Sequence, residues 1–547
     1  MDRTGGEALA AQLAHEQVTD VFGVPGVQLD SAMDGLAKHT GQIRFITARH
    51  EQGAAYMADG YARSSGRPGV FMVVPGPGIL NASAALSTAY ACSSPVVALI
   101  GQIPSRHLGQ GRGLLHEIRE QSAIVASLTK WSAMAHSPSE IPTLVHEAFT
   151  QVRSGRPQPV ALELPPDVLA GRADVELIEA AALQHRDEPD ADLLGKAAEL
   201  LRAAARPLIY VGSGVIASGA SDQLRKLAEL VEAPVVMSSN GRGAISERHP
   251  LALNSLAGRR LLAHADVVLA VGSRFITSAG GRVATAADAT VILVNTDVTH
   301  LAMLPSAALA VHGDAQLCLA ALAECLTGAE GRPSRALEVA QARAWAEEQV
   351  DAVEPQASWA RALRAAMPED GILVNELTQV GYVARVAYSV YEPRSFLTPG
   401  YQGTLGYGFP TAIGAKIANP SKAVVSVTGD GGFGWSLQEL STARMHGVAV
   451  AIVVFNDNAF GNVRRTQREE FDARYIGSEL VNPDFVALAS SFGVRGVRVE
   501  SPEELTRVLS EALGANQAIL IEVPVADMPS GWHLIIDQPP AATVPSL

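Results

Sequence analysis

The stretch Ser426-Val-Thr-Gly-Asp-Gly-Gly-Phe433, followed by Ala449-Val-Ala-Ile-Val-Val-Phe-Asn-Asp-Asn458, decides the fold class. Each half is a β-branched run that ends in small or polar residues, and a stretch of helical character, 436–445, separates them. This order is typical of two parallel strands joined by a helix. Because parallel strands end at the same edge of a sheet, Asp430 and Asp457 are expected to lie close together there.

The same alternation of short apolar runs and Ala/Leu-rich stretches extends along the whole chain. It predicts an α/β fold with three consecutive doubly wound parallel-sheet domains, and the polar stretches 186–192 and 328–334 mark the linkers. The predicted domains are 1–185, 190–328 and 340–547. The predicted strands are 19–22, 44–47, 70–74, 96–100, 160–164, 208–211, 234–237, 267–271, 291–294, 372–375, 424–427, 449–455 and 518–523.

The composition restricts the class of protein. The 547 residues include 42 Lys and Arg against 56 Asp and Glu, a net charge of −14, which argues against nucleic acid or an anionic membrane as a partner. Three cysteines are too few for a disulfide framework, and Cys318 and Cys325 are expected on one buried helix face. No basic segment followed by an apolar run opens the chain, so a cytoplasmic location is expected.

The Gly-Asp-Gly turn has the chemistry of a phosphate and metal site. Glycines at a strand-to-helix turn let backbone N–H groups approach a phosphate, and the helix N-terminus adds a partial positive charge. Two carboxylates together with a backbone carbonyl and phosphate oxygens form an oxygen shell that suits Mg²⁺. The alternative, that Gly429-Asp430-Gly431 is only a turn, is weakened by Asn456-Asp457-Asn458 at the end of the next strand.

Gly429-Asp430-Gly431 together with Asn456-Asp457 resembles the bipartite cofactor motif of thiamine diphosphate enzymes, and the resemblance extends over essentially the whole chain. It implies pyrimidine-binding, central and diphosphate-binding domains, in that order, with Mg²⁺ bound by Asp430, Asp457 and the Ala459 carbonyl. One departure is that the position of Asp457 is more commonly Asn in this family. The resemblance further implies cofactor contacts from Glu51, Pro25, Gly76, Asn81, Thr378, Gly403, Leu405, Gly429, Gly431, Gly432, Phe460 and Gly461.

The segment Arg49-His-Glu-Gln-Gly-Ala-Ala-Tyr-Met-Ala-Asp-Gly-Tyr-Ala-Arg63 looks like the activating-glutamate segment of the same family. The resemblance implies that Glu51 shares a proton with the pyrimidine ring and thereby promotes the C2 ylid of the cofactor. The alternative is that Glu51 only complements the charge of a helix N-terminus. The run Gly400-Tyr-Gln-Gly-Thr-Leu-Gly-Tyr-Gly-Phe-Pro410 resembles the segment that bends the cofactor, with Leu405 as the apolar wedge.

The reaction is less well defined by the sequence. Val21-Phe-Gly-Val-Pro-Gly26 and Ala265-Asp-Val-Val-Leu-Ala-Val-Gly-Ser-Arg-Phe275 resemble acetohydroxyacid (acetolactate) synthase, but Thr466 stands in place of its substrate-selecting tryptophan. The stretch 251–260 lacks the flavin-contacting pattern, so FAD is not expected. Benzoylformate-decarboxylase-like members have a histidine where this chain has Val74, which removes an obvious general acid. A more local match to benzaldehyde lyase implies catalytic roles for Gln121 and Tyr401. Pro25 and Gln28 stand where that enzyme has paired histidines, and Gln28 would still place a polar amide near the substrate. The alternative for Gln28 and Gln121 is a surface or capping role.

Together these features predict a thiamine diphosphate- and Mg²⁺-dependent lyase or ligase of C–C bonds. It would act on 2-oxo acids or acyloins through the ylid and an enamine, with the decarboxylation and carboligation of an acetolactate synthase. The alternatives are a benzaldehyde lyase-like carboligase without decarboxylation, a non-catalytic cofactor-binding regulatory subunit, and a dehydrogenase that uses Gly212-Ser-Gly214. The family resemblance also implies at least a homodimer, commonly a tetramer, with small-molecule substrates whose identity the sequence leaves open.

Overall fold

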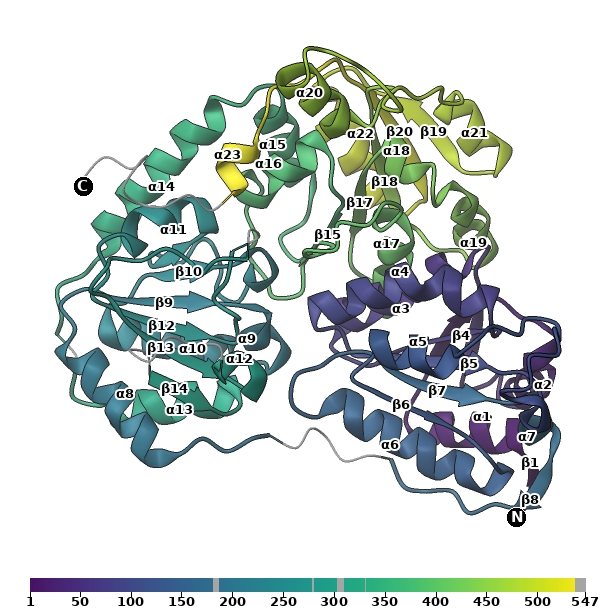
Figure 1. Ribbon diagram of the computed structural model, residues 1–547. Helices are drawn as coiled ribbons and strands as arrows, with labels where there is room; N and C mark the ends of the chain where they lie inside the picture. The colour runs from purple at the N-terminus through teal and green to yellow at the C-terminus, as the bar shows by residue number, and fades with distance from the viewer. Residues whose placement is uncertain (181–185, 278–279, 303–308, 330, 537–547) are drawn as a thin grey trace.

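The computed structural model describes residues 1–180, 186–277, 280–302, 309–329 and 331–536. Three six-stranded parallel sheets follow one another along the chain, and helices cover both faces of each sheet (Figure 1). The predicted fold class, three consecutive doubly wound α/β units, is therefore confirmed. The domain bounds inferred from the linkers stay a prediction.

The N-terminal sheet has the strand order β3-β2-β4-β5-β7-β6, and an antiparallel pair, β1 with β8, lies outside it. The strands are β1 (Asp2–Thr4), β2 (Asp20–Gly23), β3 (Arg44–Thr47), β4 (Gly69–Val73), β5 (Val96–Gly101), β6 (Trp131–Met134), β7 (Val160–Leu164) and β8 (Arg172–Asp174). The helices are α1 (Gly5–His15), α2 (Asp30–Ala37), α3 (Glu51–Ser65), α4 (Pro77–Cys92), α5 (Gln121–Leu128), α6 (Ile141–Arg153) and α7 (Pro166–Ala170).

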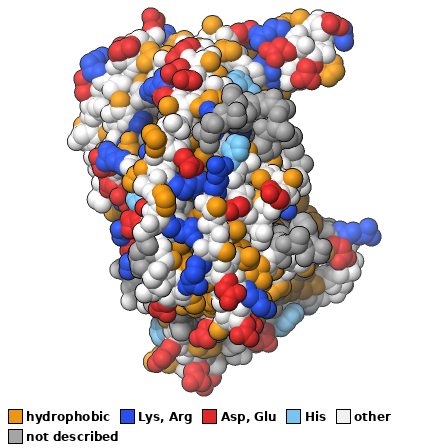
Figure 2. Space-filling model, turned by 90° about the vertical axis from the view of Figure 1, so that its left-hand side faces the viewer, with side chains coloured by type: hydrophobic (Ala, Val, Ile, Leu, Met, Phe, Trp, Pro, Cys, Tyr) orange, Lys and Arg blue, Asp and Glu red, His pale blue; other side chains and the backbone are white. Residues whose placement is uncertain are grey.

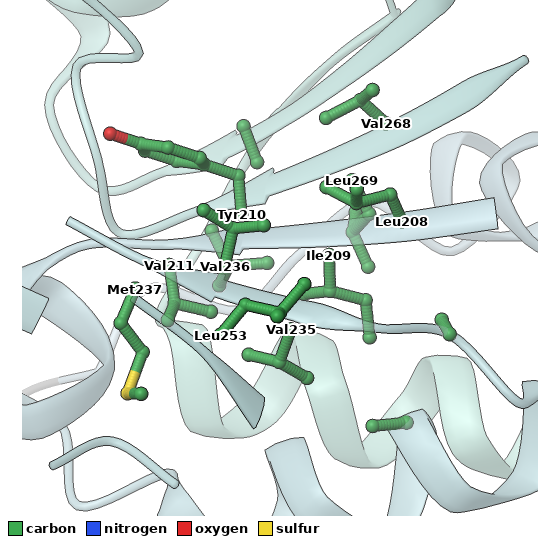
Figure 3. Packing of buried hydrophobic residues seen from close by; sticks show 14 of the residues in the cluster. Leu208, Ile209, Tyr210, Val211, Val235, Val236, Met237, Leu253, Val268 and Leu269 are labelled. Atoms are coloured by element: carbon green, nitrogen blue, oxygen red, sulfur yellow. The ribbon is translucent and has the colours of Figure 1, made fainter. Parts of the chain in front are cut away.

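The central sheet has the order β11-β10-β9-β12-β13-β14, and its aliphatic side chains pack against the flanking helices, as Figure 3 shows for Leu208, Ile209 and Leu269. The strands are β9 (Pro207–Val211), β10 (Val235–Met237), β11 (Ala252–Leu253), β12 (Val267–Val271), β13 (Thr290–Asn295) and β14 (Leu309–His312). The helices are α8 (Ala191–Ala203), α9 (Ser213–Ala217), α10 (Ser221–Val231), α11 (Ser255–Leu262), α12 (Val298–Ala302) and α13 (Ala315–Cys325).

The C-terminal sheet has the order β16-β15-β17-β18-β20-β19. The strands are β15 (Ile372–Asn375), β16 (Phe396–Leu397), β17 (Val424–Gly429), β18 (Ala451–Asn456), β19 (Arg495–Arg498) and β20 (Ile519–Pro524). The helices are α14 (Ala336–Asp351), α15 (Gln356–Ala366), α16 (Gln379–Ala387), α17 (Gly408–Ala418), α18 (Asp430–Phe433), α19 (Leu440–Met445), α20 (Gly461–Glu470), α21 (Phe485–Ser491), α22 (Pro502–Gly514) and α23 (Trp532–Ile535).

Helices α3 and α17 join the N-terminal and C-terminal sheets (Figure 1). A Cβ atom on Gly60 of α3 would overlap the Thr411 carbonyl of α17, and one on Gly414 of α17 would overlap the Met57 carbonyl of α3. The two backbones therefore touch directly, which only residues without a side chain permit. This close packing accounts for the Ala- and Gly-rich composition of the segment that begins at Glu51.

Two smaller predictions concern the cysteines and the helix after the Gly-Asp-Gly turn. Cys318 is buried in α13, but Cys325, the last residue of that helix, is exposed, so the expectation that both share a buried face is wrong for Cys325. The stretch 436–445 is helical only in part, since a 3₁₀ turn (Leu437–Glu439) precedes α19.

The surface is mixed in charge. Figure 2 shows Lys and Arg side chains interspersed with Asp and Glu on the face that carries the central sheet. In the part of the chain that the structure describes, no helix combines the length and the apolarity needed to span a membrane.

Candidate functional site

The two carboxylates predicted to bind a metal lie together at the carboxyl edge of the C-terminal sheet. Strands β17 and β18 are parallel neighbours, and Gly429 pairs with Phe455, so Asp430 and Asp457 follow adjacent strand ends. Burial, together with the neighbouring charge of Asp430, raises the pKa of Asp457 to about 6. Two carboxyl groups that disfavour each other's ionisation in this way are suited to share a cation.

A cleft of about 220 Å³ opens beside these carboxylates. Residues predicted to contact the cofactor or metal line it: Thr378, Gly403, Leu405, Gly429, Asp430, Gly431, Gly432, Asp457, Ala459, Phe460 and Gly461. The structure thus brings together the C-terminal part of the predicted site, from four separate segments of the chain. The lining residues of this cleft all come from 376–528.

The glycines of the cleft are required by close packing. A Cβ atom on Gly431 would lie 2.8 Å from the Phe460 ring, and one on Gly461 would overlap the Asp457 carboxylate. Gly403 has a left-handed φ of 61°, a conformation that L side chains rarely adopt. A cleft lined by glycine backbone and two carboxylates fits a diphosphate bound together with a divalent cation.

Asn482, which is not among the predicted site residues, hydrogen-bonds to the Asp430 carboxylate. Its side-chain amide donates to Asp430 Oδ2 at 2.6 Å and to Asn456 Oδ1 at 3.0 Å. Asn482 lies in a loop after the second motif, where Asn482-Pro483 signals a turn but nothing signals a metal site. The described residues contain no group of three or more His, Cys, Asp or Glu that could hold a metal ion. A cation at Asp430 and Asp457 would therefore need carbonyl and phosphate oxygens as further ligands.

Glu376 is a second residue that the sequence reasoning missed. It is buried, and it accepts hydrogen bonds from the amides of Gly406 (2.8 Å) and Gly408 (3.0 Å) and from Thr428 Oγ1 (2.7 Å). Burial raises the pKa of this carboxyl group. Glu376 thereby fixes the backbone just after Leu405 against strand β17. The sequence feature that could have identified Glu376 is its place as an acidic residue directly after an apolar strand, in Asn375-Glu376-Leu377.

The N-terminal part of the predicted site lies at the carboxyl edge of the N-terminal sheet. Glu51 is the first residue of α3, is half-buried, and accepts a hydrogen bond of 2.9 Å from Asn81 Nδ2 of α4. Gly76, the N-cap of α4, has a φ of 59° and lies against the backbone of His116. Pro25 is exposed in the loop after β2. The predicted residues of this part of the site therefore come from the loops and helix N-termini that follow the neighbouring strands β2, β3 and β4.

The two glutamines predicted to be catalytic are buried on the same edge and already hydrogen-bonded. Gln121 accepts from the Gly76 amide at 2.9 Å and donates to the Gly101 carbonyl and to Glu163 Oε2. Gln28 donates to the Leu115 carbonyl at 3.1 Å, and its oxygen lies 3.0 Å from Nδ1 of His116. In this structure both amides position loops of the N-terminal edge.

Tyr401 occupies a different place from the other predicted residues. It is exposed, it stacks on the guanidinium of Arg274 with 4.8 Å between Cζ and the ring centre, and it lines a second cleft of about 280 Å³. Gly212 and Gly214 line this second cleft as well, at the carboxyl ends of the central strands. Tyr401 is not among the residues that line the first cleft.

Glu439 and His446 of the C-terminal region hydrogen-bond to the segment that leads into Glu51. The Arg49 amide donates to both carboxylate oxygens of Glu439 at 3.2 Å, and the Thr47 amide donates to Nε2 of His446 at 3.1 Å. Thr442 Oγ1 completes the Glu439 site at 2.6 Å. Burial raises the pKa of Glu439 to about 7. Sequence reasoning missed Glu439 because its partners lie nearly 400 residues away along the chain.

The raised pKa of Glu439 predicts that the stability of the protein depends on pH. Because the pKa of Glu439 is raised in the folded protein, its contribution to stability is fully present below about pH 4.5. That contribution declines as the pH rises through about 7, by up to about 3 kcal/mol. We expect Glu439→Gln to remove this part of the decline when apparent melting temperatures are compared at pH 5 and pH 8. Parallel pH profiles for the two proteins would contradict the assignment.

The C-terminal segment borders the first cleft. Val525 and Met528 line it, Trp532 Nε1 donates to Asn462 Oδ1 of α20 at 2.7 Å, and Arg259 of α11 donates to the His533 carbonyl at 2.9 Å. This segment is therefore anchored on both the C-terminal and the central regions.

Comparisons with known proteins agree with this arrangement. Models of the thiamine pyrophosphate enzyme N-terminal, central and C-terminal domains match residues 3–124, 194–322 and 378–523. The chain is 36% identical over 529 residues to a probable 2-ketoarginine decarboxylase, AruI, of Pseudomonas aeruginosa, covering 95% of this chain and 94% of the relative. It is 34% identical over 555 residues to a probable acetolactate synthase large subunit of Methanocaldococcus jannaschii (95% and 92% covered). It is 32% identical over 550 residues to the acetolactate synthase isozyme 3 large subunit of Escherichia coli (95% of each).

The three domain models match the chain in the predicted order, and the relatives align over nearly its entire length. Both findings agree with a cofactor cleft that is lined by glycines. This chain belongs to the thiamine pyrophosphate (thiamine diphosphate) enzyme family.

Proposed function

We propose that this chain is a thiamine diphosphate- and Mg²⁺-dependent enzyme that decarboxylates a 2-oxo acid and can transfer the resulting acyl unit to a carbonyl acceptor. The observation that carries the proposal is the pair Asp430 and Asp457 beside a glycine-lined cleft at adjacent strand ends. Relatives named acetolactate synthase and 2-ketoarginine decarboxylase support a 2-oxo acid as the substrate class.

Thiamine diphosphate, when bound, supplies a carbon nucleophile that adds to the carbonyl group of a 2-oxo acid and accepts the electrons released with CO₂. The residues of the chain have separate tasks around it. Asp430, Asp457 and the Ala459 carbonyl would hold Mg²⁺, while the backbone of 429–432 and Thr378 would bind phosphate oxygens. Leu405 would support the bend between the rings, and Glu51 would hold a proton on the pyrimidine ring.

We also propose that the active site is completed by a second copy of the chain. The cleft that holds the metal carboxylates is lined by residues of 376–528, and Glu51 does not line it. Glu51 instead lies at a half-buried N-terminal edge with Asn81, Gly76 and Gln28. A homodimer that places this edge of one subunit over the cleft of its partner would bring Glu51 to the pyrimidine ring, and two dimers would give a tetramer.

A panel of 2-oxo acids, offered with and without aldehyde acceptors, tests the reaction. CO₂ and acyloin are measured separately, with thiamine diphosphate omitted in one arm and Mg²⁺ removed by EDTA in another. We expect CO₂ release that requires both. Acyloin formation from the aldehydes without CO₂ release from any acid would favour a benzaldehyde lyase-like reaction. Thiamine diphosphate binding without any turnover would favour a regulatory subunit.

A further inference from the structure

A cavity of about 430 Å³ lies where the N-terminal, central and C-terminal regions meet. Its wall includes the ends of α3, α4 and α6, helix α9 of the central region, and the strand β16 of the C-terminal region. None of its lining residues lines the thiamine cleft. Glu51 begins α3 and Arg63 lines the cavity twelve residues later, so Glu51 and the cavity lie about 18 Å apart along the helix.

The charges on the cavity wall are not balanced. The charged residues that line it are Glu16, Asp20, Arg63, Arg67, Arg153 and Arg394. Both carboxylates already have cationic partners: Glu16 pairs with Arg153 at 3.1 Å, and Asp20 pairs with Arg44, which lies outside the wall, at 2.6 Å. The wall therefore keeps positive charge that its own carboxylates do not offset.

Arg394 and Arg67 are the sources of this uncompensated charge. Arg394 donates to the carbonyls of Arg63 (3.3 Å) and Ile216 (3.1 Å), and no carboxylate of the described residues lies within 4 Å of it. Arg67 lies over the Tyr61 ring at 4.8 Å and has no ion pair within the described ranges. Burial lowers the pKa of Arg394, as expected for a guanidinium removed from water without a counter-charge. A guanidinium carries five N–H donors, so both arginines keep capacity for an anion.

The rest of the wall is largely apolar. Phe149 and Val152 of α6, Ile216 of α9, and Phe396 and Leu397 of β16 contribute hydrocarbon surface. Cavities of this size that combine an apolar wall with a few convergent polar groups are typical of small-molecule sites. Two arginines on the wall of a largely apolar cavity suit one carboxylate on an aromatic or branched body, because the apolar wall would disfavour a more highly charged group.

We propose that this cavity is an accessory binding site for an organic carboxylate with an aromatic or branched apolar body, held by Arg394 and Arg67. The cavity shares no lining residue with the thiamine cleft. Arg63 nevertheless connects the two sites, because it donates to the Thr398 carbonyl (2.7 Å) and to the Tyr407 hydroxyl (2.8 Å). These two residues flank the segment that contains Gly403 and Leu405, so Arg63 links the cavity wall to a loop that lines the thiamine cleft.

Isothermal titration of the full-length protein, loaded with thiamine diphosphate and Mg²⁺, tests the site with phenylacetate. This acid has no 2-oxo group and cannot be decarboxylated as a 2-oxo acid, so the titration reads binding alone, whatever reaction the enzyme performs. We expect one phenylacetate per chain, with the Kd raised at least tenfold in Arg67→Gln and in Arg394→Gln. Arg225→Gln, which changes an exposed arginine of α10 in the same way, should bind as the wild type does.

Two further probes separate the elements of the proposal. Phenylacetamide has the same shape without the charge and is expected to bind at least tenfold more weakly than phenylacetate. Equal affinity for the two would overturn recognition of the charge, and phosphate binding in the absence of phenylacetate binding would overturn the carboxylate assignment. Circular dichroism of each variant verifies its fold, and since Arg67 is exposed, Arg67→Gln should remain folded. Unchanged phenylacetate binding in a folded Arg67→Gln protein would overturn the assignment of Arg67.

Discussion

Replacing Glu51 by glutamine is expected to lower turnover by about 10²- to 10⁴-fold, because the side chain loses the proton that general acid–base catalysis requires. The fold should persist. Glu51 lies at the first position of α3, is half-buried, and is hydrogen-bonded through an oxygen that glutamine also provides to Asn81. Turnover of the preferred 2-oxo acid, measured at saturating thiamine diphosphate and Mg²⁺, gives the result.

The matched control for this substitution is Glu120→Gln. Glu120 is an exposed carboxylate on a loop of the same N-terminal region, so the chemical change is identical and only the position differs. Titration of thiamine diphosphate into both variants separates loss of activation from loss of binding. Near-normal turnover in Glu51→Gln would contradict the assignment of this residue as the activating acid.

The sequence predicted every central strand of the three six-stranded sheets but only one of their six edge strands, β3. The predictions for β3, β7, β12 and β15 match the structure residue for residue. Seven strands are absent from the prediction. Five of them, β6, β11, β14, β16 and β19, lie at the edge of a six-stranded sheet, and the other two, β1 and β8, form the separate antiparallel pair. Central strands of a parallel sheet are buried on both faces and form continuous apolar runs. An edge strand such as β19, Arg495–Arg498, is short and partly exposed, and it has no such run.

The candidate site shows the same division between local and distant information. Asp430 and Asp457 could be predicted because each follows an apolar strand within a short motif, and the strand order makes them neighbours. Glu439 and Asn482 could not, because their partners are reached only by tertiary packing. The position of Tyr401 also depends on packing. Tyr401 follows Gly400 in the segment predicted to bend the cofactor, yet the Tyr401 ring stacks on Arg274 of the central region.

The Asp430→Asn substitution is expected to weaken Mg²⁺-dependent binding of thiamine diphosphate by more than about 100-fold. Asp430 is buried, its carboxylate is oriented by Asn482, and an amide would replace a charged oxygen ligand that a hard cation strongly prefers. Asp457→Asn provides the matched comparison, because it makes the same chemical change at the adjacent strand end. It leaves one oxygen available for the metal while removing a negative charge that repels both Asp430 and the diphosphate. We therefore expect binding within about tenfold of the wild type.

Equilibrium dialysis of thiamine diphosphate against each protein, with Mg²⁺ and then with EDTA, measures both effects. In wild type, EDTA should reduce binding to the level of Asp430→Asn, because the cation links the carboxylates to the diphosphate. An equal loss of thiamine diphosphate affinity in the two variants would mean that Asp430 and Asp457 contribute equally to metal binding. Binding of thiamine diphosphate that resists EDTA would show instead that the glycine backbone of 429–432 and Thr378 hold the diphosphate without a metal.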